Sequence, residues 1–304
     1  MEEDNLRICL QKHLPHEQEL VNSIKKDDGI LYAAFMKTKL WSNDDLITVS
    51  FISDREPIRT PIEKIREDSL KYNITIDPLQ EKVEKMSVKD AIKLIVRERV
   101  QPLIPMKIKW INESQYADIR IDFRPVGSWS LVGTDSRNSK DKNKATMNFG
   151  WFDVATVIHE WGHALGMIHE HQNPRGQNIK WDLDALYKWA KKTQGWDKKT
   201  VDNNIVNHYK LDQINGSNFD PDSIMLYFFP AKLTTDGNGT HENLILSETD
   251  VNWISKIYGK PTPNDFLSTE RGTNSGKTIK LIFLIILIIL LLISIIFILY
   301  KIAR

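Results

Sequence analysis

Four histidines and two glutamates crowd residues 159–171, HEWGHALGMIHEH, in a chain that has only eight histidines. His159 and His163 are four residues apart, so on a helix they project from the same face on successive turns. Two imidazoles placed in this way can bind one metal ion, and Glu160 lies beside them. The stretch therefore predicts metal-assisted chemistry.

Gly166 follows this pair, and glycine is the residue that most readily adopts the left-handed conformation that ends a helix. A sharp turn there would bring His169 back toward the same metal. Three neutral imidazoles at roughly 2.1 Å leave a fourth position open, which is the arrangement of a catalytic zinc site. We therefore predict one Zn²⁺ per chain, bound by His159, His163 and His169.

Glu160 is the predicted general base and acid of the site. A carboxylate next to the open position can take a proton from water and later pass it to a leaving amine. Zinc lowers the pKa of that water toward about 7 and polarises the scissile carbonyl. The predicted reaction is peptide hydrolysis without a covalent intermediate. Histidines that only form hydrogen bonds within a core are the alternative, and they would not need the fixed spacing H-E-x-x-H-x-x-G-x-x-H.

The elements that must position these residues follow from the pattern of apolar positions. Residues 153–166 predict a helix that Asp153 caps, and residues 87–100 predict a second helix with a serine cap. The polar stretch 134–144, TDSRNSKDKNK, predicts a solvated loop. Strands are predicted at 46–52, 106–111, 117–123, 127–133 and 145–150. The mixture indicates an α+β fold.

Residues 281–300, LIFLIILIILLLISIIFILY, contain only Ser294 and Tyr300 with polar groups. At about 1.5 Å per residue, twenty positions span roughly 30 Å, the thickness of the bilayer's hydrocarbon core. We predict a transmembrane helix at 279–300 and a short basic tail at 301–304. A buried core helix is the alternative, and it would need protein on every face. Residues 261–278 are rich in Pro, Gly, Ser, Thr and Asn and predict a flexible linker.

The composition limits the remaining possibilities. The formal net charge is +1 and the basic residues are scattered, so no nucleic-acid partner is predicted. Cys9 is the single cysteine, which excludes an internal disulfide and a thiolate metal cage within one chain. The acidic N-terminus, MEEDNLRICLQKHLPHEQEL, does not predict a secretory signal peptide. The sequence does not indicate an oligomeric state.

At the histidine motif the sequence resembles the metzincin zinc endopeptidases, and more narrowly the astacin family, which places a glutamate directly after the third histidine, as Glu170 stands here. SIMLY at 223–227 resembles the family's Met-turn. LSETDVNWISKIYG at 246–259 resembles the segment that ends its catalytic domain. The resemblance covers roughly residues 30–260.

The resemblance implies an astacin-like catalytic domain with two subdomains, a twisted mixed sheet with long helices followed by a more irregular C-terminal part. It makes His159, His163 and His169 the zinc ligands and Glu160 the general base and acid. Met225 would be the apolar floor of the metal site, and Tyr227 would stabilise the tetrahedral oxyanion.

The resemblance also implies roles outside the ligand set. The strand in SWSLVG, residues 128–133, would align a substrate chain antiparallel to itself, unless it is an ordinary internal strand. Glu170 would contact a new N-terminal amine if residues 1–29 were removed as a pro-segment.

The sequence departs from the family in two ways: Leu226 replaces the histidine usual in astacins, and the family's usual disulfides cannot form. Cys9 as a zinc-blocking thiolate is a weaker alternative, because no metal-ligand spacing surrounds it. Histidines 171, 208 and 241 are interpreted as surface residues or as supports for the ligands.

The predicted function is that of a zinc metalloendopeptidase whose substrates are peptides or proteins and whose C-terminal helix, 279–300, tethers it to a lipid bilayer as a single-pass membrane protein. The charges flanking the span favour a catalytic domain that faces the cytoplasm. An Ile-, Asn- and Lys-rich composition suits the product of an AT-rich genome, such as a virus acting on a viral or host-cell membrane. Two alternatives stay open: a catalytically silent, membrane-tethered zinc-binding protein that keeps the protease fold, and a hydrolase of non-peptide amides.

Overall fold

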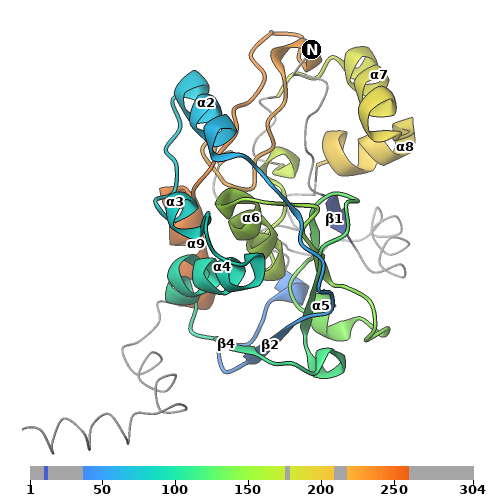
Figure 1. Ribbon diagram of the computed structural model, residues 1–304. Coiled ribbons are helices and arrows are strands. Elements are labelled where there is room, and N and C mark those ends of the chain that lie inside the picture. The colour runs from blue at the N-terminus through green and yellow to red at the C-terminus, as the bar shows by residue number, and fades with distance from the viewer. Residues whose placement is uncertain (1–9, 13–36, 175–178, 209–217, 260–304) are drawn as a thin grey trace, which may run out of the picture. The chain divides into compact units, whose positions relative to one another are not determined.

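The computed structural model describes residues 10–12, 37–174, 179–208 and 218–259 (Figure 1). Within these ranges, no helix combines the length and the apolar character needed to cross a membrane. The predicted membrane span, linker and basic tail lie outside the described residues, and so does all of the predicted pro-segment except residues 10–12.

A mixed six-stranded sheet organises the described part of the chain. The strand order is β1-β6-β7-β5-β2-β4. The β6–β7 pair is antiparallel and the other pairs are parallel. A second sheet pairs β3 (Ile58–Arg59) with β8 (Trp151–Phe152). The strands of the large sheet are β1 (Leu10–Lys12), β2 (Leu46–Phe51), β4 (Lys107–Trp110), β5 (Ile119–Asp122), β6 (Trp129–Leu131) and β7 (Met147–Asn148). All five strands predicted from the sequence are confirmed.

The helices include both that the sequence predicts. Ser87 Oγ accepts from the Asp90 amide at 3.2 Å, so the predicted serine cap is confirmed. The α-helices are α2 (Ile62–Tyr72), α3 (Leu79–Val83), α4 (Val88–Ile95), α5 (Asp135–Asn138), α6 (Val154–Ala164), α7 (Leu183–Gln194), α8 (Lys198–Val201) and α9 (Glu248–Tyr258). Short 3₁₀ or π turns lie at Lys37–Lys39, Val96–Val100, Gln101–Leu103, Ser114–Tyr116, Glu170–Gln172, Asp202–Val206 and Ala231–Leu233.

Buried apolar side chains form two clusters. The larger one joins the sheet to α4, α6 and α9 through residues such as Ile47, Ile92 and Val157. The smaller one comes from chain beyond Gly166 and includes Leu186, Trp189 and Phe229. Figure 1 shows the matching separation of elements, with α7 and α8 together and away from β2 and β4. The observed mixture of sheet and helices agrees with the predicted α+β class.

Helix α6 carries the histidine pair and is fixed at both ends. The Asp153 side chain accepts from the Thr156 amide at 2.7 Å, which confirms the predicted cap. Gly166 has φ of 98°, in the region that favours glycine, as the predicted turn requires. Beyond the last helical turn, carbonyl groups lack partners within the helix. The Trp41 indole donates to one of them, Ala164 O, at 2.7 Å, and the Tyr258 hydroxyl donates to Leu165 O at 2.5 Å.

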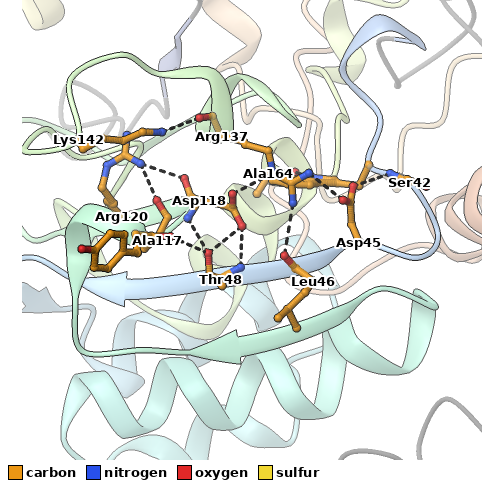
Figure 2. Close-up of polar contacts among 12 residues, drawn as sticks. Ser42, Asp45, Leu46, Thr48, Ala117, Asp118, Arg120, Arg137, Lys142 and Ala164 are labelled. Carbon is orange, nitrogen blue, oxygen red and sulfur yellow. Dashed lines mark hydrogen bonds and ion pairs between the residues drawn. The ribbon is translucent and has the colours of Figure 1, made fainter.

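The prediction that residues 134–144 form a solvated loop is wrong at their start. Asp135 and Ser136 are buried in the short helix α5, and Asp135 pairs with the buried Lys39 at 2.5 Å. Arg137 donates to Asp118 at 2.9 Å and to Asp45 at 2.7 Å (Figure 2). The stretch has no apolar residues, yet its charged groups pack because their partners come from distant parts of the sequence.

Asp135→Asn is expected to lower the free energy of unfolding by about 3–5 kcal/mol, because it leaves the Lys39 ammonium buried without its counter-charge. Chemical denaturation followed by tryptophan fluorescence measures this loss. The exposed Asp141–Lys144 pair, 3.2 Å apart, provides a matched control, and Asp141→Asn is expected to change stability little. The double variant Lys39→Met, Asp135→Leu should recover much of the loss. Equal effects of the two single variants would contradict the importance of the buried pair.

Candidate metal centre

The structure brings together the three histidines that the sequence predicts as ligands. His159, His163 and His169 are all buried and each offers a ring nitrogen, and these atoms lie within 4.8 Å of one another. His163 Nε2 and His169 Nε2 are 3.0 Å apart. A tetrahedral zinc ion with bonds of about 2.1 Å holds its nitrogens about 3.4 Å apart. This spacing lies between the 3.0 Å separation of His163 Nε2 and His169 Nε2 and the 4.8 Å limit for the three ring nitrogens.

Two backbone carbonyls determine which nitrogen of each helix histidine carries the proton. His159 Nδ1 donates to Ile224 O at 2.8 Å, and His163 Nδ1 donates to Met167 O at 2.8 Å. A carbonyl oxygen can only accept, so the proton lies on Nδ1 and the lone pair on Nε2 faces the other ligands. Among the described residues, His159 Nε2 is buried and has no hydrogen-bond partner. Burial lowers the pKa of His159 to about 4, so the ring is neutral at pH 7. This donor set fits zinc.

Glu160 lies next to His159 on α6 and its side chain is fully buried. It belongs to the same helical turns as the two ligands, which is the arrangement that the H-E-x-x-H spacing predicts.

Met225 and Tyr227, which the resemblance assigns to the site, both contact residues of the histidine motif. Met225 is fully buried, and a Cβ atom added to Gly162 would lie only 2.6 Å from its sulfur. Glycine at this position of α6 therefore makes room for the methionine beneath the helix. The Tyr227 hydroxyl is 2.5 Å from His169 Nε2, so the phenol reaches the point where the imidazoles converge.

The residues that follow the third ligand are buried as well. Glu170 Oε1 accepts from the Asp220 amide and from the Asn173 side chain, both at 2.9 Å, and burial raises the pKa of this carboxyl to about 8. His171 is 1% exposed, and its ring centroid lies 5.3 Å from that of His169 and 4.8 Å from that of Tyr227. Of the two sequence interpretations of His171, the one as a support for the ligands agrees with this packing.

Asp250 of α9 is a residue that sequence reasoning did not assign to the site. Its carboxylate accepts from the Ile224 amide at 2.9 Å and from the Ser223 hydroxyl at 2.8 Å. Ile224 is the residue whose carbonyl binds His159, so Asp250 holds the Met-turn in the position that orients a ligand. The sequence feature that could have drawn attention to Asp250 is the capping pattern that it forms with Ser247 at the start of α9.

The predicted substrate-aligning strand, β6, has a neighbour on each side in the described structure. β7 pairs with it antiparallel, and β1 pairs with it in parallel, with Leu10 opposite Trp129 and Lys12 opposite Leu131. The side of β6 away from β7 is therefore paired with a segment near the start of the chain.

The model of one protein family, the peptidase family described as Astacin, matches residues 70–252, which is more than half of the chain. The chain belongs to the astacin family. The family and the three converging histidines together identify the cofactor as one zinc ion and the protein as a zinc metalloprotease.

Similar chains are found among solved structures. A structure of myroilysin is 32% identical in sequence, with a TM-score of 0.59, over 75% of this chain and 99% of that chain. High choriolytic enzyme 1, a hatching enzyme zinc-protease from the medaka fish Oryzias latipes, is 13% identical, with a TM-score of 0.41, over 77% of this chain and 100% of that chain. A comparison with curated proteins finds no match.

Asp250 is expected to make stability depend on pH. Burial raises the pKa of this carboxyl from 3.8 to about 6, so between these values the folded protein holds a proton that the unfolded chain releases. Stability should therefore fall as the pH rises through that window. Asp250→Asn should flatten this part of the profile, measured as urea unfolding midpoints from about pH 3.5 to 7. The exposed Asp184→Asn variant, which should keep the wild-type slope, is the control. An unchanged slope in Asp250→Asn would contradict the assignment.

Proposed function

We propose that this protein is a zinc-dependent endopeptidase that hydrolyses peptide bonds with water. The observation that carries the proposal is the convergence of three imidazole nitrogens within 4.8 Å, two of them from helix α6, which also presents Glu160. Family membership supports the reaction class, and a peptide or protein is accordingly the proposed substrate.

His159, His163 and His169 are the proposed zinc ligands. Bound zinc would supply a Lewis acid that polarises the scissile carbonyl and favours deprotonation of water. The Nδ1–H groups of the first two rings stay bonded to Ile224 O and Met167 O, which keeps the rings oriented while substrate binds.

Glu160 is the proposed general base and acid. Its carboxylate would accept the proton of the attacking water and then deliver it to the nitrogen of the leaving amine. No covalent enzyme intermediate is needed, because water is the nucleophile.

Tyr227 is the proposed donor to the oxyanion that forms when the carbonyl carbon becomes tetrahedral. Its hydroxyl lies 2.5 Å from a ligand nitrogen, which supports a role as hydrogen-bond donor to a carbonyl oxygen at the site. Met225 would act only by packing beneath the ligands.

The N-terminal segment, residues 1–29, is proposed to be a pro-segment of the catalytic domain at 30–260. Pairing of Leu10–Lys12 with β6 supports this, because a strand on that side of β6 occupies backbone groups that an aligned substrate would use. Contact of Glu170 with a new N-terminal amine remains part of the same proposal.

A single transmembrane helix at 279–300, joined by the linker at 261–278, is proposed to tether the protease to a bilayer. Twenty nearly uninterrupted apolar residues support it. Arg271, Lys277 and Lys280 before the apolar run 281–300, against Lys301 and Arg304 after it, favour a catalytic domain on the cytoplasmic side. A viral or host-cell membrane is the proposed location.

Glu160→Gln is expected to lower kcat by roughly 10² to 10⁴, because it removes proton transfer and leaves the ligands intact. Cleavage of a quenched peptide library measures activity, and elemental analysis should still find one zinc per chain. A chelator should abolish wild-type activity, and added zinc should restore it. Glu248→Gln, at an exposed position of α9, is the matched control and should behave as wild type. Zinc binding without cleavage in the wild type would instead support a silent binding protein.

The membrane tether predicts that the full chain stays with the membrane fraction after an alkaline carbonate wash. A chain that ends at residue 260 should be released, because it lacks the apolar segment. In sealed vesicles with the cytoplasmic face outward, added protease should digest the catalytic domain. A full chain recovered in the supernatant, or a domain protected from digestion, would contradict the tether or its orientation, respectively.

A further inference from the structure

A pocket of about 490 Å³ lies beside the metal centre, with His159 and Tyr227 among its lining residues. Its volume falls within the range of sites that bind small ligands or single side chains. The first half of α6 forms one wall, from Asp153 to His159. Other lining residues, including Thr60 and residues of α2, precede residue 70 and so lie outside the range that the astacin family model matches.

Part of the pocket lining is apolar. Trp151, Ile224, Leu226 and Leu244 line it, and Tyr72 of α2 packs against another lining residue, Phe228, with ring centroids 5.3 Å apart. Such walls suit the methylene chain of a long side chain.

The charged lining residues are mostly acidic. Five carboxylates and two ammonium groups contribute, namely Glu67, Asp68, Asp77, Asp153, Glu242, Lys64 and Lys71. Lys64 is paired with Asp68 at 2.9 Å, and Asp77 is paired with Arg99 at 2.6 Å. Even with Arg99 counted, five acids face three cations, so the lining has an excess of acidic groups.

Asp153 is a buried acid of this set and lies at the start of α6. It is 9% exposed and accepts from the Thr156 amide and the Thr60 hydroxyl, both at 2.7 Å. A carboxylate has about four acceptor positions, so two remain. Among the described residues no cationic group pairs with it. A neutral asparagine would cap α6 as well, so the cap alone does not require the charge.

We propose that this pocket receives a lysine or arginine side chain of the substrate, at a position flanking the cleaved bond, and that Asp153 determines this specificity. The proposal rests on the proposed peptidase function. Six residues of helix separate His159 from Asp153, a rise of about 9 Å. Lysine and arginine side chains are long enough to cover this distance, and their terminal positive charge would pair with Asp153. Their methylene stems would pack against the apolar lining residues.

The test compares matched peptides that carry lysine or norleucine at either residue flanking one cleavable bond. Zinc-loaded full chain is used, before and after removal of residues 1–29. The wild type should prefer lysine in kcat/KM. Asp153→Asn should reduce the lysine-to-norleucine ratio roughly 10- to 100-fold, because it removes a charged hydrogen-bond acceptor while keeping the cap. Asp182→Asn, which changes the equivalent cap of α7, should leave the ratio unchanged.

Binding provides a readout that does not depend on turnover. The same peptides are titrated calorimetrically into zinc-loaded Glu160→Gln, with and without Asp153→Asn. Lysine-selective binding that requires Asp153, with no cleavage by any form, would reject the peptidase function and keep the pocket assignment. The assignment would be overturned if Asp153→Asn left the lysine-to-norleucine ratio unchanged in cleavage or in binding. A preference of the wild type for acidic peptides would overturn it as well. Asp153→Ser replaces Asp153→Asn if the latter fails to fold.

Discussion

Two hydrogen bonds from imidazole to backbone, His159 Nδ1 to Ile224 O and His163 Nδ1 to Met167 O, are the constraint on which the metal centre depends. They fix the protonated nitrogen of each ring, so both Nε2 lone pairs face inward before any ion binds. Because the acceptors are main-chain atoms of the Met-turn and of the turn after α6, the site is only as well ordered as those two turns. The orientation of both helix histidines therefore depends on the position of these two carbonyl oxygens.

Several distant elements hold these turns. Asp250 of α9 fixes the Ile224 amide, and the hydroxyl of Tyr258, from the same helix, caps the end of α6. Trp41, near the other end of the described chain, caps the neighbouring carbonyl. Residues separated by more than 100 positions thus converge on one helix of eleven residues. The site is preorganised because His159 and His163 are each bonded to a backbone carbonyl whose turn is itself held by buried contacts.

The sequence predicted the features whose signals are local. The spacing of His159 and His163, the Asp153 cap and Gly166 all carry periodic or conformational information, and each occupies the expected place. Features that depend on partners far away in the sequence were missed. The burial of Asp135 depends on Lys39, and the wall of the pocket depends on α2 packing near Phe228. A short run of charged and polar residues predicts a solvent-exposed segment. A counter-charge from a distant part of the sequence can make burial of such a residue favourable, and a short run does not show it.

X-ray absorption at the zinc edge, on the metal-loaded protein, tests the central claim most directly. The account predicts three nitrogen ligands from imidazole at about 2.0–2.1 Å, together with an exchangeable oxygen ligand in the fourth position. It also predicts that the ligand count falls from three to two imidazoles in His169→Ala. A sulfur ligand at about 2.3 Å, or fewer than three imidazoles in the wild type, would contradict the site described for this chain.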